Sequence, residues 1–260
     1  QPLNSWDVSN VTIMKATFAG ASSFNQPLYS WDTSNVMYMN VMFANTDSFN
    51  QPLDSWDVSN VTDMSAMFAN AVVFNQPLNS WDVSNVMDMT GMFSNTGLFN
   101  QSLANWNVSN VSVMDGMFSS ATDFNQPLNS WDVSNVASMF GMFGDYVASA
   151  RSDHEQSYGL PYDQWDQPTK DAFWGQMSII LGYSVDEQSY VPNPSGLSTA
   201  NYDATLIAWS AQNLESNVTF DGGKSKYCTS ETQRQSIITN FSWTINDAGK
   251  DCSSPVEPEA

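Results

Sequence analysis

Basic side chains, histidine and cysteine are scarce in this 260-residue sequence. Seven lysines and arginines stand against 27 aspartates and glutamates, which gives a net charge of -20 with one histidine and two cysteines. Binding to nucleic acid or to an anionic membrane surface needs clustered lysine and arginine, so the charge argues against both partners. An acidic surface suits cations, basic partners or simple solubility. No run of 18 apolar residues is present, so we expect no membrane insertion within this segment.

The sequence also lacks the patterns of common catalytic sites. It contains no Gly-x-Ser-x-Gly motif, no glycine-rich phosphate loop, and no cysteine and histidine set with metal-ligand spacing. His154 is the only histidine. We therefore expect a protein that is not an enzyme, with no catalytic residues, no metal centre and no cofactor.

The two cysteines, Cys228 and Cys252, lie in one C-terminal segment. Their spacing favours a local disulfide that closes a loop of about 25 residues and stabilises the fold by ~3 kcal/mol. Such a bond indicates an oxidising setting, which means an extracellular or cell-surface location. A pair of free, buried thiols is the alternative.

What the sequence has in abundance is a 25-residue repeat. The string SWDVSNV at residues 5–11 returns as SWDTSNV at 30–36 and unchanged at 55–61, 80–86 and 130–136. A fixed period of this length indicates a solenoid, a propeller or an array. Six units fit within residues 1–146, and the first begins part-way through a unit. Their tryptophans are Trp6, Trp31, Trp56, Trp81, Trp106 and Trp131.

The apolar columns of the repeat predict the structure of one unit. Tryptophan and the valine two residues later have the period of a strand, so we expect a short strand around SWDVS. Met64, Met67, Phe68 and Ala71 have the three-and-four spacing of a short helical or 3₁₀ turn. Stacked units would bury tryptophan on tryptophan, methionine on methionine and phenylalanine on phenylalanine. The invariant asparagines, Asn10 onward and Asn25 onward, are expected to bond the backbone of neighbouring coils.

An acidic column lies between the inward residues of the predicted strand, and its side chains are expected to face outward. Like charges one coil apart repel. Three compensations are open: hydrogen bonds from the flanking serines, cations along the row, or a basic partner. Calcium is a weak candidate, because no EF-hand spacing is present. The candidate binding residues are this column, Asp7, Asp32, Asp57, Asp82, Asn107 and Asp132, with the variable neighbours Tyr29, Asp54 and Asn79.

The unit FNQPLDSWDVSNVTDMSAMFANA at residues 49–71 closely resembles the repeat of the BspA-like leucine-rich-repeat surface proteins. Those proteins occur on bacteria, on mycoplasmas as lipoproteins, and in some protists and large viruses. The string Trp-Asp-Val-Ser-Asn-Val, followed by Met, Met-Phe and Phe-Asn-Gln, carries the likeness over residues 1–144. The resemblance implies a right-handed, leucine-rich-repeat-like solenoid displayed on a surface, with a role in adhesion or interaction and with no catalytic residues.

The rest of the chain divides into three parts. Residues 147–195 form an atypical insert with a helix expected from Pro168 to Leu181, and its many aromatics either pack the open end of the solenoid or stack on sugar rings. Residues 196–252 predict an α/β cap in which Ser230 and Gln233 make a capping box. Residues 253–260 predict a flexible tail. The cap is expected to contain helices within 199–213 and 230–241 and strands within 217–223 and 242–247.

We expect a non-catalytic extracellular or cell-surface protein that mediates adhesion through a surface protein or glycan of another cell. The alternative is a structural subunit that assembles with copies of itself into a filament or surface layer. The outward apolar residues that would make lateral contacts in such an assembly are Ile13, Val72, Val73, Leu98 and Val113.

Overall fold

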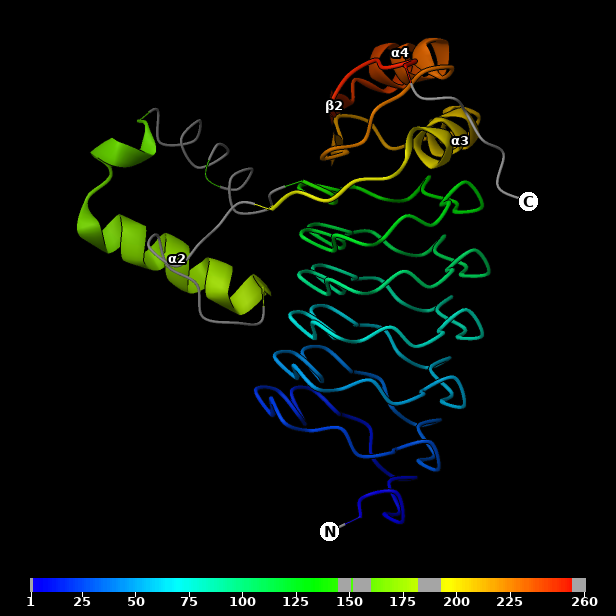
Figure 1. Cartoon of the computed structure of the whole chain (residues 1–260), viewed down its shortest axis with the longest axis vertical. Coiled ribbons are helices and arrows are strands. Elements are labelled where there is room, and N and C mark those ends of the chain that lie inside the picture. Colours follow the sequence, from blue (N-terminus) through cyan, green and yellow to red (C-terminus); the bar gives the residue numbers. More distant parts are fainter. Residues whose placement is uncertain (1, 145–150, 152–159, 182–192, 254–260) are drawn as a thin grey trace.

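The computed structural model describes residues 2–144, 151, 160–181 and 193–253. Residues 2–144 form coils that lie one on another, and a cap with helices and a small sheet lies at the C-terminal end of this stack (Figure 1). Each coil is one 25-residue unit. Parallel bridges join the units through one residue each: Ile13, Tyr38, Asp63, Asp88, Val113 and Ser138. The right-handed, leucine-rich-repeat-like class stays a prediction.

The parallel bridges between units lie seven residues after each tryptophan and no strand forms at SWDVS, so the prediction of a strand around that segment is wrong. Around that segment the backbone closes two turns, because the Trp31 amide donates to the Leu28 carbonyl and the Val36 amide donates to the Thr33 carbonyl. These short bonds within one unit leave no extended segment for a strand.

The predicted helical turn is also wrong. Its alternate backbone amides donate to the next unit, as Val41 does to Ser65 at 2.8 Å and Asn45 does to Ala69 at 2.9 Å. A helix would use those amides internally. Val41 and Asn45 have φ of 61° and 59°, and the same two positions are left-handed in other units. Glycine and asparagine adopt this conformation readily, and they occupy both columns repeatedly, as at Gly91, Gly116, Asn70 and Asn95.

The core is a set of like-on-like columns, as the apolar pattern predicted. Phe43 and Phe68 stack with ring centroids 5.6 Å apart, and Trp31 and Trp56 stack at 6.2 Å. Both phenylalanines are fully buried. The Trp56 Nε1 also donates to the Leu28 carbonyl of the preceding unit at 3.0 Å, so the largest side chain of the core has its polar atom satisfied.

The cap continues the stack. Strand β1 (Thr219–Asp221) bridges from Phe220 to Met139 of the sixth unit, and it pairs in parallel with β2 (Thr244–Asn246). Helices α3 (Thr199–Ser210) and α4 (Glu231–Phe241) contact each other, and Trp209 of α3 packs edge-on against Phe220 of β1. All four elements lie where the sequence predicted them. The cap begins before residue 196, because the Ser195 amide already donates to the Phe143 carbonyl at 2.8 Å.

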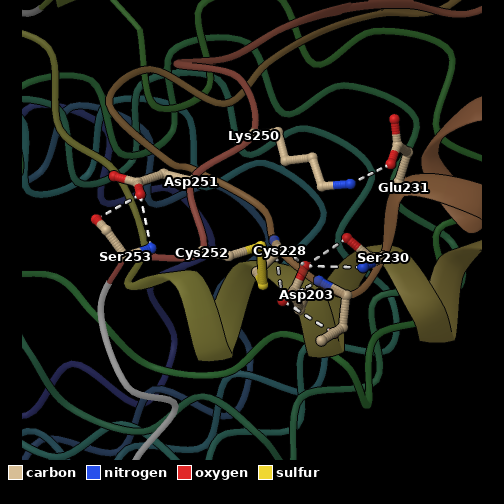
Figure 2. The surroundings of a disulfide bond; sticks show 9 residues. Asp203, Cys228, Ser230, Glu231, Lys250, Asp251, Cys252 and Ser253 are labelled. Carbon is tan, nitrogen blue, oxygen red and sulfur yellow. Dashed lines mark hydrogen bonds and ion pairs between the residues drawn. A yellow bond between two sulfur atoms is a disulfide. The ribbon is translucent and has the colours of Figure 1, made fainter.

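Cys228 and Cys252 form the predicted disulfide, so the alternative of two free thiols is wrong. Beside it, the buried Asp203 of α3 accepts bonds from the backbone amides of Cys228, Thr229 and Ser230 at 3.0, 2.9 and 3.1 Å (Figure 2). These amides belong to the segment that leads into α4 from the disulfide, so one carboxylate fixes the entry to that helix.

The predicted capping box of Ser230 and Gln233 is therefore wrong. The Ser230 Oγ donates to Asp203 at 2.6 Å and makes no cap bond within α4. The Gln233 Oε1 is buried without a hydrogen-bond partner. The Ser230 amide and hydroxyl are instead taken by a carboxylate from a distant helix, which no spacing within residues 230–233 signals.

The insert contains the 3₁₀ helix η1 (Tyr162–Gln164) and α2 (Gln167–Leu181), close to the predicted helix. Tyr162, Trp165 and Phe173 contact one another, with centroids 5.0 Å apart for the first pair and 5.6 Å apart for the second. They do not cover the end of the stack, because β1 and α3 occupy it and α2 lies to one side (Figure 1). Within the described residues, no helix is both long and apolar enough to cross a membrane.

Candidate binding face

The aspartate column is exposed, as predicted, and each carboxylate is bonded within its own coil. Asp32 Oδ1 accepts the Ser34 amide at 3.1 Å and the Ser34 hydroxyl at 2.6 Å. These bonds from serine hold the pKa of Asp32 below its usual value, although the charge of Asp7 raises it slightly. Asp7 and Asp82 have lowered pKa values for the same first cause, their serine partners. The serine compensation proposed for the charged row is therefore present in the structure.

The rest of the column repeats this arrangement. Asp57 and Asp132 accept the amides of Ser59 and Ser134 at 3.0 Å, and Asn107 accepts the Ser109 amide at 3.2 Å. No three aspartate, glutamate, histidine or cysteine side chains gather to hold a metal ion anywhere in the described part of the chain. The structure thus gives the aspartate row a local role in closing each turn.

The variable neighbours Tyr29, Asp54 and Asn79 each accept a hydrogen bond from the next coil. The carbonyls of Tyr29 and Asp54 accept serine hydroxyls of the next coil at 2.8 and 3.2 Å, and the Asn79 Oδ1 accepts the Asn105 amide at 2.9 Å. Two backbone carbonyls and one side-chain oxygen of these residues therefore accept hydrogen bonds between coils. The side chains of Tyr29 and Asp54 face solvent.

A groove lies on a neighbouring part of the coil surface, and sequence reasoning did not select it. Its volume is about 710 Å³, and it runs from the first unit to the fifth. Met37 and Met87 are 41% and 53% exposed, which is unusual in a chain whose other stacked methionines are buried. None of the lining residues is charged. They are Thr12, Asn35, Met37, Asn60, Thr62, Asn85, Met87 and Asn110.

The groove is held rigid by hydrogen bonds between coils. Nδ2 of Asn35 donates to the Ser9 carbonyl at 2.8 Å, and Nδ2 of Asn60, Asn85 and Asn110 donates to the corresponding serine carbonyls at 2.7 Å. The backbone beneath is a ladder in which Met37 donates to Thr12 at 2.9 Å and Met87 donates to Thr62 at 3.0 Å. The predicted bonding role of the asparagine column is confirmed. Its second role as a groove wall is new.

A signal for the groove was present in the sequence. The position two residues after each invariant asparagine reads Thr12, Met37, Thr62, Met87, Ser112 and Ala137, so a polar and a large apolar residue alternate until the small Ala137 of the sixth unit. A core column would be uniformly apolar, and an unused surface column would vary without order. The alternation therefore distinguishes this position both from a core column and from an unused surface column.

A second hollow of about 520 Å³ lies where the sixth coil meets the cap. It is polar and contains the carboxylates of Asp132 and Glu215. Gln212 closes one side of it by accepting the Val133 amide and donating to the Trp131 carbonyl, both at 2.8 Å. Gln212 thereby ties the cap to the backbone of the sixth coil.

The repeat region matches the family described as "Mycoplasma protein of unknown function, DUF285" over residues 1–97 and again over 74–158. The two matches together span more than half of the chain. The chain belongs to this family. The second match extends past residue 144, where the visible repeat ends, into residues that lie mostly outside the described part of the structure. No curated protein and no solved structure matches the chain.

Proposed function

We propose that this DUF285 chain is a non-catalytic module of an extracellular or cell-surface protein, and that it mediates adhesion by binding a partner along the groove. The observation that carries the proposal is an exposed, uncharged groove that crosses several units and is fixed by bonds between coils. A rigid surface loses little conformational entropy when it binds, which favours recognition.

The groove's side chains support binding without catalysis. Asparagine, threonine and methionine do not titrate near neutral pH, and no general base lines the groove beside the threonine hydroxyls. The disulfide in the cap supports an oxidising setting for the protein.

A binding screen against extracellular matrix proteins, polysaccharides and intact cells tests this function. The groove variant carries Met37→Glu and Met87→Glu, which place two charges in the groove. The matched control is Leu98→Glu, because Leu98 is 49% exposed and does not line the groove. Thermal melting of all three proteins establishes that each is folded.

We expect the wild-type protein and the Leu98→Glu control to bind the same surface, and the groove variant to lose at least tenfold in affinity, which is about 1.4 kcal/mol. Equal binding by the control and the groove variant would place recognition elsewhere on the molecule. If the folded wild-type protein binds no surface in the screen, the adhesion proposal fails.

A further inference from the structure

The charge of the groove differs from that of the rest of the stack. Residues 1–144 contain eleven aspartates and one lysine, yet none of the groove residues carries a charge. A basic ligand would be drawn to the aspartate columns, and an acidic ligand would be repelled by them. The groove therefore suits a neutral ligand.

Each groove asparagine has bonding capacity left for such a ligand. One Nδ2 hydrogen is used on the serine carbonyl of the preceding coil. No described residue donates to the Oδ1 of Asn35, Asn60, Asn85 or Asn110. An amide with one acceptor and one remaining hydrogen pairs well with hydroxyl groups, since a hydroxyl both donates and accepts.

The groove has two periods along the stack. The asparagines repeat every unit, and the threonine and methionine alternate every two units. Parallel-bridged coils lie about 4.8 Å apart, so these periods are about 5 and 10 Å. An extended peptide repeats every two residues, or about 6.7 Å, and matches neither period. A β-1,4-linked pyranose chain advances one ring over nearly one coil spacing, and alternate rings turn over by half a turn.

We propose that the groove binds a neutral β-1,4-linked polysaccharide chain with one sugar ring beside each of its four asparagines. The asparagines bond ring hydroxyls, and Met37 and Met87 pack against the apolar faces of two alternate rings, whereas Thr12 and Thr62 bond hydroxyls of the neighbouring rings, whose hydroxymethyl groups the half turn places on the opposite side of the chain. This inference rests on the proposed function and names the ligand class for the same groove.

Isothermal titration calorimetry with β-1,4-linked glucose oligomers of increasing length tests the register. We expect the affinity to rise with each added ring until about four rings are bound, because four asparagines line the groove, and then to level off. The α-1,4-linked glucose oligomers have the same composition but a curved chain, and we expect them not to bind. Raising the salt concentration should leave the affinity unchanged, because the ligand is neutral.

Two variants assign the contacts. Thr62→Val keeps the shape but removes the hydroxyl, so it should weaken binding by about tenfold, and Met87→Glu should abolish it. Leu98→Glu should bind as the wild-type protein does. Equal affinity for α- and β-linked oligomers, levelling off at two rings, or no effect of the groove variants would overturn the inference.

The calorimetry also separates this inference from the proposed function. If a matrix protein or a cell binds through the groove while β-1,4-linked oligomers do not, the ligand class is wrong and the adhesive function stands. If neither binds, both are wrong.

Discussion

Each unit in the stack of residues 2–144 is stabilised by copies of itself, whereas the cap of residues 193–253 is stabilised by unlike groups. In the stack, phenylalanine lies on phenylalanine, and from the second unit to the sixth the tryptophan Nε1 donates to a leucine carbonyl of the preceding unit. The cap uses a disulfide, the bonds to Asp203, and an ion pair of Arg234 with Asp247 at 2.8 Å, whose side chains are 19% and 2% exposed.

The difference follows from what each part must do. A repeated unit finds matching partners on both sides, so one set of columns satisfies all units and the outward positions stay free to vary. The cap has a coil on one side only. It must therefore cover the apolar residues and bond the polar groups at the end of the sixth coil with side chains that do not belong to the repeat. Gln212 and Ser195 do this for the sixth coil. The outward positions of the stack can therefore change without loss of the fold, and the cap's buried polar groups serve stability.

Removal of one core ring in the middle of the stack tests the strongest part of this comparison. Phe68→Ala should destabilise the protein by about 3–5 kcal/mol, because Phe68 is fully buried between Phe43 and Phe93. Phe18→Ala is the matched control at the first coil, where the side chain is only partly buried and the cost should be clearly smaller. Urea unfolding measures both, and equal losses would show that neighbours on both sides do not matter.

Loss of the disulfide tests the cap in the same way. A variant with Cys228→Ser and Cys252→Ser should lose about 3 kcal/mol, because the bond closes a loop across a sequence separation of 24 residues. Hydrogen exchange should show the loss in α3 and α4 while the amides of the central coils keep their protection. Equal loss of protection throughout the stack would mean that cap and coils unfold as one unit.

The sequence predicted the parts of the fold that repeat or alternate. The 25-residue period placed the core columns, and the cap's helices and strands followed from their apolar spacing. The strand and helical turn inside each unit were wrong, because strand and helix periods were assigned to a backbone that closes turns and donates to the next coil. Left-handed residues such as Val41 gave no warning, since valine rarely adopts that conformation.

The candidate site was predicted in part. Reasoning from charge selected the aspartate column, which is exposed but already bonded to serine. It passed over uncharged residues such as Asn60 and Met87, which line the groove. The asparagines were correctly assigned to bonds between coils, but a sequence does not show that a side chain with one structural bond also has atoms left for a ligand.

The carboxylate of Asp203 makes the stability of the cap depend on pH. Burial raises its pKa, but hydrogen bonds from Ser230, Thr229 and Cys228 outweigh that effect and leave the pKa below the ordinary 3.8. A lowered pKa contributes stability above the unfolded value, and this contribution is lost as the pH falls through the folded value. Asp203→Asn should cost about 1.5–3 kcal/mol at pH 7, because bonds to a charged group are lost.

Urea unfolding of the wild-type protein and the Asp203→Asn variant at a series of pH values checks this. The difference in unfolding free energy should be constant above about pH 5 and should shrink as the pH drops below 3.8. Asp54→Asn is the control, because Asp54 is exposed on the stack. A difference that stays constant down to pH 2 would show that the charge on Asp203 contributes nothing.

The smallest expected effect compares one tryptophan from each region. Trp106 in the stack is 2% exposed and its Nε1 donates to the Leu78 carbonyl at 2.9 Å. Trp209 in α3 is fully buried, and its Nε1 has no hydrogen-bond partner. Replacement by phenylalanine removes the same volume from both sites, so the costs in unfolding free energy should differ by the value of one hydrogen bond, about 1 kcal/mol.

Trp106→Phe should therefore destabilise the protein more than Trp209→Phe, because Trp209→Phe also removes an unsatisfied donor. Urea unfolding gives both values, and an equal or larger loss for Trp209→Phe would show that shape, rather than the bond between coils, fixes tryptophan in the repeat.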